Sequence, residues 1–476
     1  MSQTPTDSGV RRLADLPSPQ GLPLIGNLLQ LSPERLHLTL EQWSGELGSM
    51  YTIDLGTKRA LVCCDPELAH TVLRDRPEGY RRYSPIESVI AEQHANGLFS
   101  IEGEAWRPQR KLVMQALAAT HFRDFYPVLQ AITERLRLRW QRAADAGETV
   151  DMAVDLVRFT VDVTTALAFG EDPNTLEQSG DVVQDHLALI FPMLMSRINA
   201  PVPWWRYVKL PSDRRFDRSM KAVRAHIDGL IERTRQRLHE QPGERARNLL
   251  EAMLIASNEP GSGVTDETIF ANVITLLMAG EDTTAHTLSW TMYFLSAEPA
   301  LQARLHDEAA ALMGVALVCP QFDDVKRLDA FEALATEATR LKPIVPVFFK
   351  EALADKVLGD VAVPAGTPVF FVLRPAMLDE QRFGHASTYL PERWGDERDA
   401  SLAHDARAYV QFGAGPRVCP GRQLAGVEIR LVLSMLCRNF TMELATERAS
   451  IKEVMAFTMM PSAMPVRLRP RPAAAT

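Results

Sequence analysis

The sequence predicts a mainly α-helical protein with a smaller β portion, and three observations support this fold class. Helical periodicity dominates from about residue 103 to 340, for example over 125–146 and 222–240. Short alternating segments bounded by turn residues precede this region, and others follow residue 341. No repeat, low-complexity tract or long Gly/Ser linker divides the 476 residues, so we expect a single domain over 1–476.

The N-terminal part predicts a pair of strands followed by a helix. A Pro-rich N-terminal segment, 1–30, comes first. Residues 51–55 then alternate in polarity, and after a glycine turn 60–64 form a second apolar run. Asp65, which is followed by proline, marks the start of a helix because an aspartate side chain caps free amides and proline suits the first turn.

Composition and charge exclude several classes of function. The formal net charge of -8 argues against a nucleic-acid partner, because binding phosphates requires a basic surface. The five cysteines include an adjacent pair and no CxxC spacing, which fits neither a disulfide framework nor a structural zinc site. The apolar run 22–31 is short and interrupted, so we expect no membrane anchor and no signal peptide. A cytoplasmic protein follows from these features.

One predicted helix, 265–297, is unusually long. At about 1.5 Å per residue it extends roughly 45 Å, and apolar residues surround most of its circumference, which predicts a buried helix. The polar segment 279–284 lies at its middle and contains Gly280. Glycine there costs about 1 kcal/mol relative to alanine, and buried aspartate and threonine need partners. A local defect with its own hydrogen bonds explains this segment as well as a functional site does.

The most informative segment is the loop 409–422, which contains Cys419 and precedes an apolar helix. Its closely spaced glycines and prolines predict a tight, preformed turn. The helix N-terminus that follows and Arg417 both favour a thiolate at Cys419, whereas the other four cysteines are expected to be small core residues. A thiolate is a nucleophile or a metal ligand. No histidine base lies close in sequence, and haem is the metal complex that one protein thiolate can hold.

Five segments, in order along the chain, resemble signatures of the cytochrome P450 family. Residues 412–421 match the haem-binding signature FxxGxRxCxG, 337–340 match ExxR, and 391–394 match the later PERW element. Residues 279–284 are similar to the oxygen-binding groove of the family's central helix, and 106–110 to its WxxxR element. The resemblance implies the cytochrome P450 fold, with haem between the central helix 265–297 and the loop 409–422.

The resemblance implies haem b as the cofactor, with Cys419 as the axial ligand of the iron. Arg417 would contact a propionate, and Trp106 and Arg110 would donate to propionates from their helix; the alternative for Trp106 is a core aromatic residue. Lys350 stands where the family usually has arginine or histidine, and it supplies charge without a bidentate fork. The other cofactor-binding positions implied are Phe412, Gly413 and Gly421.

The same resemblance gives roles to residues that do not touch the iron. Glu337, Arg340 and Arg393 would form a buried charge network that supports the haem loop. Asp282 and Thr283 would be the acid–alcohol pair that delivers protons, and Gly280 and Ala279 would let the helix open for oxygen. His286, about one turn beyond Thr283, is expected to be a packed or solvated histidine and not a second ligand.

A lipophilic small molecule is the expected substrate, together with O2. The residues expected to line its pocket are apolar, although each could instead belong to the core; they are Ile274, Met278, Val345, Val347 and Phe348.

The segment after Cys419 is too short for a flavin reductase, so we expect electrons from a separate ferredoxin or flavodoxin with its reductase. Basic residues are expected to form the surface on which this acidic protein docks, although each could be ordinary solvated charge; they are Arg107, Arg110, Lys111, Arg422 and Arg430.

The sequence as a whole predicts a haem-thiolate monooxygenase that inserts one oxygen atom from O2 into a C–H or C=C bond. One alternative is a peroxygenase driven by hydrogen peroxide, which needs no proton relay, so the Asp282–Thr283 pair favours the monooxygenase. The other alternative is a non-catalytic haem protein that binds a gas.

Overall fold

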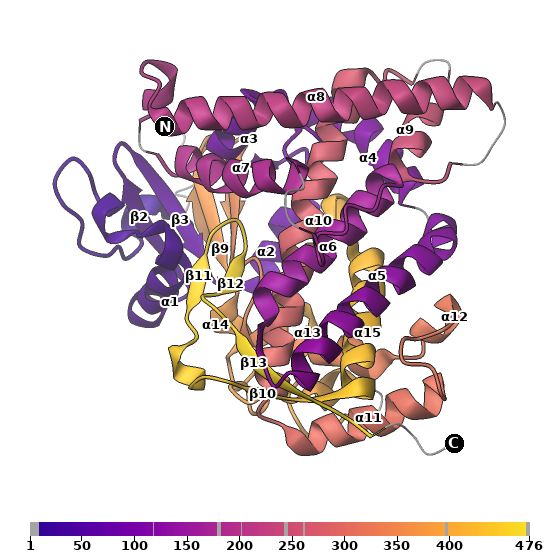
Figure 1. Ribbon diagram of the computed structural model, residues 1–476. Helices are drawn as coiled ribbons and strands as arrows, with labels where there is room; N and C mark the ends of the chain where they lie inside the picture. The colour runs from indigo at the N-terminus through magenta and orange to yellow at the C-terminus, as the bar shows by residue number, and fades with distance from the viewer. Residues whose placement is uncertain are drawn as a thin grey trace, which may run out of the picture. The chain divides into compact units, whose positions relative to one another are not determined.

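The computed structural model describes residues 9–117, 119–178, 182–200, 202–241, 246–259, 262–395 and 398–472. Contacts divide the chain into two compact units. The first, here called the sheet unit, comprises 1–88, 345–388 and 400–419; the second, the helical unit, comprises 89–344, 389–399 and 420–476. Figure 1 labels helices and strands of both units.

The sheet unit is built on a five-stranded mixed sheet in the order β2-β3-β9-β6-β4. The predicted strand pair is confirmed as the antiparallel hairpin of β2 and β3, in which Met50 lies opposite Cys63. β9 pairs parallel with β3, and β6 pairs antiparallel with β9. The strands are β2 (Met50–Leu55), β3 (Lys58–Cys63), β4 (Tyr80–Arg82), β6 (Val347–Ala352) and β9 (Pro368–Val372).

Helix α2 (Pro66–Arg74) begins where the sequence predicts it. The Asp65 side chain accepts hydrogen bonds from the backbone N–H groups of Glu67 at 2.8 Å and Leu68 at 3.3 Å, which caps two amides that have no partner in the helix. The unit also contains a small sheet in the order β1-β8-β7. The remaining elements are β1 (Arg11–Arg12), β7 (Lys356–Leu358), β8 (Val361–Val363), α1 (Leu36–Leu47) and α14 (Arg374–Met377), and α3 (Ser84–Ala91) spans the boundary between the units.

The helical unit contains the long helix predicted over 265–297, which is α10 (Asp266–Leu295). Thr265 caps it by accepting the N–H of Thr268 at 3.2 Å. Most of its residues from Ile269 to Leu295 are buried, as the distribution of apolar residues predicts. Figure 1 shows α6 (Met152–Phe169) packed along α10, and these two helices form the most extensive contact in the unit.

The other helices of this unit confirm the helical region predicted between 103 and 340. They are α4 (Trp106–Ala116), α5 (Ala119–Asp145), α7 (Val182–Ile198), α8 (Pro211–Glu240), α9 (Leu249–Ser257), α11 (Pro299–Met313), α12 (Phe322–Val325) and α13 (Asp329–Leu341). The apolar helix predicted after the loop that contains Cys419 is α15 (Arg422–Asn439). Two small antiparallel sheets complete the unit, and their strands are β5 (Thr149–Asp151), β10 (Phe440–Leu444) and β13 (Pro465–Pro470), then β11 (Glu453–Met455) and β12 (Met459–Pro461).

A buried carboxylate, Glu337 on α13, joins two segments of the helical unit. Arg340 donates to both of its oxygens at 2.8 Å, and Arg393 donates to Oε1 at 3.0 Å. The Trp394 indole donates to Oε2 at 2.8 Å, and the Leu390 N–H donates to Oε1 at 3.0 Å. The structure therefore brings together the three residues of the expected network and adds an indole and a backbone amide that the sequence did not indicate.

The charge of Glu337 is stabilised by these five hydrogen bonds. Burial alone would raise the pKa of this carboxyl group, but the hydrogen bonds from Arg340, the charge of Arg340, the Leu390 amide and the charge of Arg393 outweigh burial, and the pKa is lowered. Glu337 is therefore ionised in the folded protein, and Arg340, which is fully buried, depends on it for its countercharge.

Substituting Glu337→Gln should destabilise the helical unit strongly. The neutral glutamine amide cannot balance the charges of two buried guanidinium groups. Removing one partner of a buried ion pair costs about 3–5 kcal/mol of folding free energy. Thermal or chemical denaturation measures this cost. Glu392→Gln is a matched control in the neighbouring turn, because Glu392 is exposed and pairs with Arg304; its effect should stay within about 1 kcal/mol. Equal effects of the two substitutions would contradict the role given to Glu337.

Candidate active site

The loop that contains Cys419 is closed on itself. The Cys419 N–H donates to the carbonyl oxygen of Phe412 at 2.9 Å, and a 3₁₀ turn (Gly415–Arg417) lies between them. Gly413 and Gly415 have φ angles of 73° and 69°, in the left-handed region that favours glycine. A Cβ on Gly415 would lie 2.6 Å from the carbonyl oxygen of Leu73 in α2, so the loop packs against that helix with no room for a side chain.

The five cysteines, all within the described residues, differ in exposure. Cys419 is exposed, whereas the other four thiols are buried, as expected for core residues. Burial raises the pKa of Cys63, Cys64 and Cys437 to about 12 and also raises that of Cys319. The loop therefore presents one accessible thiol on a fixed backbone, while the remaining thiols stay protonated in the interior.

Strand β6 and the residues just before it contribute four of the expected residues of the sheet unit. Lys350 is buried, its ammonium group lies 5.5 Å from the centre of the Phe348 ring, and it donates to the Phe349 carbonyl at 3.4 Å. Val345 and Phe348 are half-buried. Val347 instead belongs to the apolar core of the sheet unit, in the same cluster as residues of β2 and β9.

Helix α4 places Trp106 and Arg110 one turn apart on one face. Trp106 is buried at the first position of the helix, and Arg110 is half-buried. Arg107 and Lys111, also four residues apart, lie on a neighbouring face and are exposed.

The polar segment of α10 holds the predicted acid–alcohol pair. The Thr283 hydroxyl donates to the carbonyl oxygen of Ala279 at 2.7 Å, a bond within the helix. Asp282 is half-buried, and burial raises its pKa to about 6. Ile274 and Met278, expected to line the substrate pocket, are buried on the same helix. A carboxyl group with a pKa near 6 exchanges its proton readily at neutral pH.

Two further acidic groups lie close to this pair in the fold. Glu281 is buried, and burial together with the charge of Asp282 raises its pKa to about 8. Glu428 of α15 is buried and hydrogen-bonded to the Thr284 hydroxyl; burial raises its pKa to about 8, against the opposing effect of that bond. Both are neutral acids at pH 7. Glu281 is visible in the polar segment, but no local pattern distinguishes Glu428 from a surface residue of α15.

His286 is a packed histidine, as expected. It is buried, and its Nδ1 atom lies 2.8 Å from the Thr458 hydroxyl. Burial lowers its pKa to about 4, so the ring is neutral at physiological pH.

The stability of the protein should fall with rising pH because of Glu428. Its pKa is about 8 when folded and near 4.5 when unfolded, so between these values the folded state retains a proton that the unfolded state releases. Replacing Glu428 by glutamine removes this pH-dependent contribution to the free energy of unfolding. Glu428→Gln should therefore gain stability relative to the parent protein as the pH rises from 5 to 8, by up to about 1.4 kcal/mol per pH unit.

Thermal denaturation at several pH values measures this difference. The exposed Glu447 provides the control, because Glu447→Gln removes one carboxylate without removing a buried acid. A difference between Glu428→Gln and the parent protein that stays constant from pH 5 to pH 8 would contradict a protonated Glu428.

Within the described ranges, no helix has the length and apolar character to cross a membrane. No group of three or more His, Cys, Asp or Glu side chains in this part of the chain could hold a metal ion.

The matches between this chain and known proteins span nearly its whole length. The family model for cytochrome P450 matches residues 16–466. The steroid 17-alpha-hydroxylase/17,20 lyase of Gallus gallus is 29% identical over 93% of this chain and 88% of its own length. Pentalenene oxygenase of Streptomyces avermitilis is 27% identical over 95% of this chain and 97% of its own. A self-sufficient cytochrome P450 monooxygenase of Aspergillus niger is 25% identical over 89% of this chain, which covers 40% of that protein.

These matches account for the loop that contains Cys419 and for the polar segment of α10. The family binds haem, iron protoporphyrin IX, through a cysteine thiolate, and the relatives include named monooxygenases. Because the family model spans much more than half of its residues, this chain belongs to the cytochrome P450 family and is a haem-thiolate oxidoreductase of the monooxygenase class.

Proposed function

We propose that this cytochrome P450 holds its haem through Cys419 and inserts one oxygen atom from O2 into a C–H or C=C bond of a lipophilic small molecule. The observation that carries the proposal is the single exposed thiol, held on a loop that the Cys419–Phe412 hydrogen bond closes. Haem bound through a thiolate supplies the chemistry, because electron donation from sulfur promotes cleavage of the O–O bond.

We also propose that four hydrogen-bond donors bind the two carboxylates of haem. Arg417 lies in the same loop as Cys419, Lys350 is on β6, and Trp106 and Arg110 are on α4. All four are hydrogen-bond donors and three are cations, which is the chemistry that a propionate requires. The other cofactor-binding positions that we propose are Phe412, Gly413 and Gly421, and the last is the N-cap residue of α15.

Substituting Cys419→Ser should abolish the strongly red-shifted Soret band of the reduced carbon monoxide complex, because serine offers no thiolate. The difference spectrum of the purified, haem-loaded protein measures this. Cys319→Ser is the control, since Cys319 is buried and donates to the Gln321 carbonyl, a bond that serine can keep. A red-shifted band that survives Cys419→Ser would overturn the assignment of the ligand.

Proton delivery is the role proposed for Asp282 and Thr283. The Thr283 oxygen has lone pairs that can accept from a water molecule while its proton is donated to Ala279. Asp282, with a pKa of about 6, can take protons from solvent and release them. A relay of this kind is needed when O2 is the oxidant and not when hydrogen peroxide is, so this pair supports the monooxygenase over the peroxygenase.

The proposed substrate class rests on apolar side chains. Ile274 and Met278 are buried on α10, and Val345 and Phe348 are half-buried in the sheet unit; Val347 is buried in the apolar cluster of the sheet unit. The names of two relatives specify a steroid and pentalenene. A lipophilic molecule is consistent with both observations.

A separate acidic ferredoxin or flavodoxin, with its reductase, is the proposed electron source. Arg107 and Lys111 are exposed on one face of α4, where they can attract an acidic partner. Arg430, also expected on this basic surface, pairs with Asp329 at 3.0 Å and with Glu332, so the proposal rests on Arg107 and Lys111.

Reversing a charge by Lys111→Glu should slow the reduction of the protein roughly threefold or more at low ionic strength, and the difference should shrink as salt is added. Stopped-flow reduction by a bacterial ferredoxin and its reductase measures the rate. Lys221→Glu is a control with the same change in net charge on α8, another exposed site. Equal rates for the two variants would exclude Lys111 from the docking surface.

A further inference from the structure

Helix α6 contacts α10 next to the proposed proton relay. The Thr160 hydroxyl lies 2.7 Å from the carbonyl oxygen of Glu281. It is farther from two carbonyls of its own helix, those of Val157 at 2.9 Å and Leu156 at 3.1 Å. A hydroxyl group has one proton to donate, so we assign it to the shortest contact, which crosses between the helices. The peptide group that accepts this bond is the one that joins Glu281 to Asp282.

One turn later on α6, Thr164 fills the space beside Gly280. Its hydroxyl donates to the Thr160 carbonyl at 2.7 Å, and its methyl group faces α10. A Cβ on Gly280 would lie 2.4 Å from that methyl carbon, well inside van der Waals contact. Thr160 and Thr164 are four residues apart and so share one face of α6. This face holds the Gly280–Glu281 segment by one hydrogen bond and one close steric contact.

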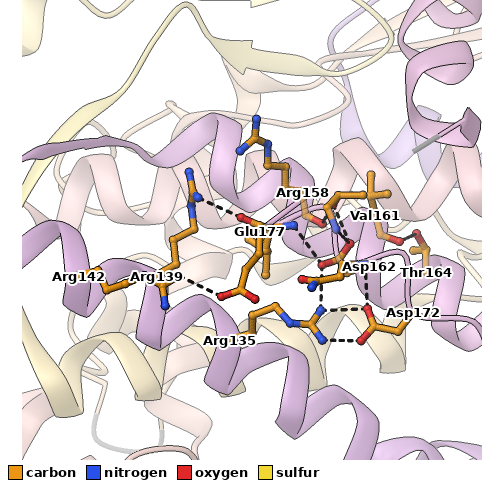
Figure 2. Close-up of polar contacts among 12 residues, drawn as sticks. Arg135, Arg139, Arg142, Arg158, Val161, Asp162, Thr164, Asp172 and Glu177 are labelled. Carbon is orange, nitrogen blue, oxygen red and sulfur yellow. Dashed lines mark hydrogen bonds and ion pairs between the residues drawn. The ribbon is translucent and has the colours of Figure 1, made fainter. Parts of the chain in front are cut away.

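The opposite face of α6 is fixed by Asp162. At about 100° per residue, Asp162 points away from the face that Thr160 and Thr164 share. Its carboxylate accepts from both the hydroxyl and the N–H of Thr175 at 2.7 Å. Figure 2 shows that Arg135 reaches Asp162, at 3.4 Å, and also Asp172. These contacts tie α6 to α5 and to the segment after α6, which resists rotation of α6 about its axis.

We infer that Thr160 is a positioning residue, which holds the Glu281–Asp282 peptide so that the Asp282 carboxyl group is oriented for proton transfer. The inference rests on the proposed function of Asp282. The expected consequence of losing the bond follows from the balance of the reaction. Each productive turnover uses one substrate molecule, O2, two electrons and two protons, and gives one hydroxylated product and one water molecule. When protons are delivered wrongly, the same two electrons and two protons leave with O2 as hydrogen peroxide.

The test compares Thr160→Val, which has the same shape but no donor, with Thr160→Ser, which keeps the hydroxyl. In the haem-loaded protein, amide hydrogen exchange over 277–285 should accelerate several-fold in Thr160→Val and not in Thr160→Ser. With a ferredoxin system and a turned-over substrate, product per NAD(P)H should fall about fivefold, with a matching rise in hydrogen peroxide. Thr133→Val is the control, since the buried Thr133 hydroxyl donates to Leu129 of its own helix.

An Asp282→Asn variant tests the proposed proton relay and the proposed restraint by Thr160 separately. If Asp282→Asn remains fully coupled, the relay assigned to Asp282 fails, but hydrogen exchange still tests the restraint by Thr160. If Thr160→Val causes the same loss of coupling in the Asp282→Asn background as in the parent protein, Thr160 does not act through Asp282 and the inference is overturned. Unchanged exchange over 277–285 in Thr160→Val would overturn it as well.

Should Thr160→Val fail to retain haem, the contact at Gly280 provides a second route. Gly280→Ala introduces the 2.4 Å clash and should accelerate exchange over 277–285. Adding Thr164→Ser removes the methyl group, and the nearest remaining atom, the Thr164 Cβ, lies 3.6 Å away. The double variant should therefore restore the exchange of the parent protein. Exchange that is the same in the single and the double variant would show that α6 does not restrain this segment.

Discussion

The cost of removing a carboxylate from water governs the chemistry of the helical unit. A buried acid has two ways to avoid that cost: it can be paired with cations and donors, or it can remain protonated. Glu337 follows the first course, with five hydrogen bonds that lower its pKa. Glu281 and Glu428 follow the second, with pKa values of about 8. The first solution places an ion pair in the interior, whereas the second places neutral, protonated acids there.

Asp282 lies between these two extremes. With a pKa of about 6, it is neither locked in the charged form, as Glu337 is, nor kept neutral at pH 7, as Glu428 is. A relay group needs this intermediate state, because it must both gain and lose a proton near the working pH. The same desolvation argument separates the thiols: burial keeps four cysteines protonated, and the loop leaves Cys419 exposed.

Features of the chain that are local in sequence could be predicted, and features that depend on tertiary contacts could not. The caps Asp65 and Thr265 and the bounds of α10 follow from residues within one turn of each other. The Glu337–Arg340–Arg393 network was expected only because two motifs resemble those of a known family. Arg430, in contrast, pairs with two acidic residues of α13 that lie about 100 positions away in sequence, so these partners could not be judged from the sequence.

The glycine of the central helix shows how one residue can satisfy two requirements. Gly280 costs about 1 kcal/mol of helix propensity relative to alanine, and the sequence alone did not distinguish a tolerated defect from an oxygen-binding groove. The structure gives it a steric reason, because the Thr164 methyl group occupies the space of its missing Cβ. That close approach also brings Thr160 within 2.7 Å of the Glu281 carbonyl. The contact between α6 and α10 therefore gives Gly280 a packing requirement, and the same contact carries the hydrogen bond by which we propose that Thr160 orients Asp282.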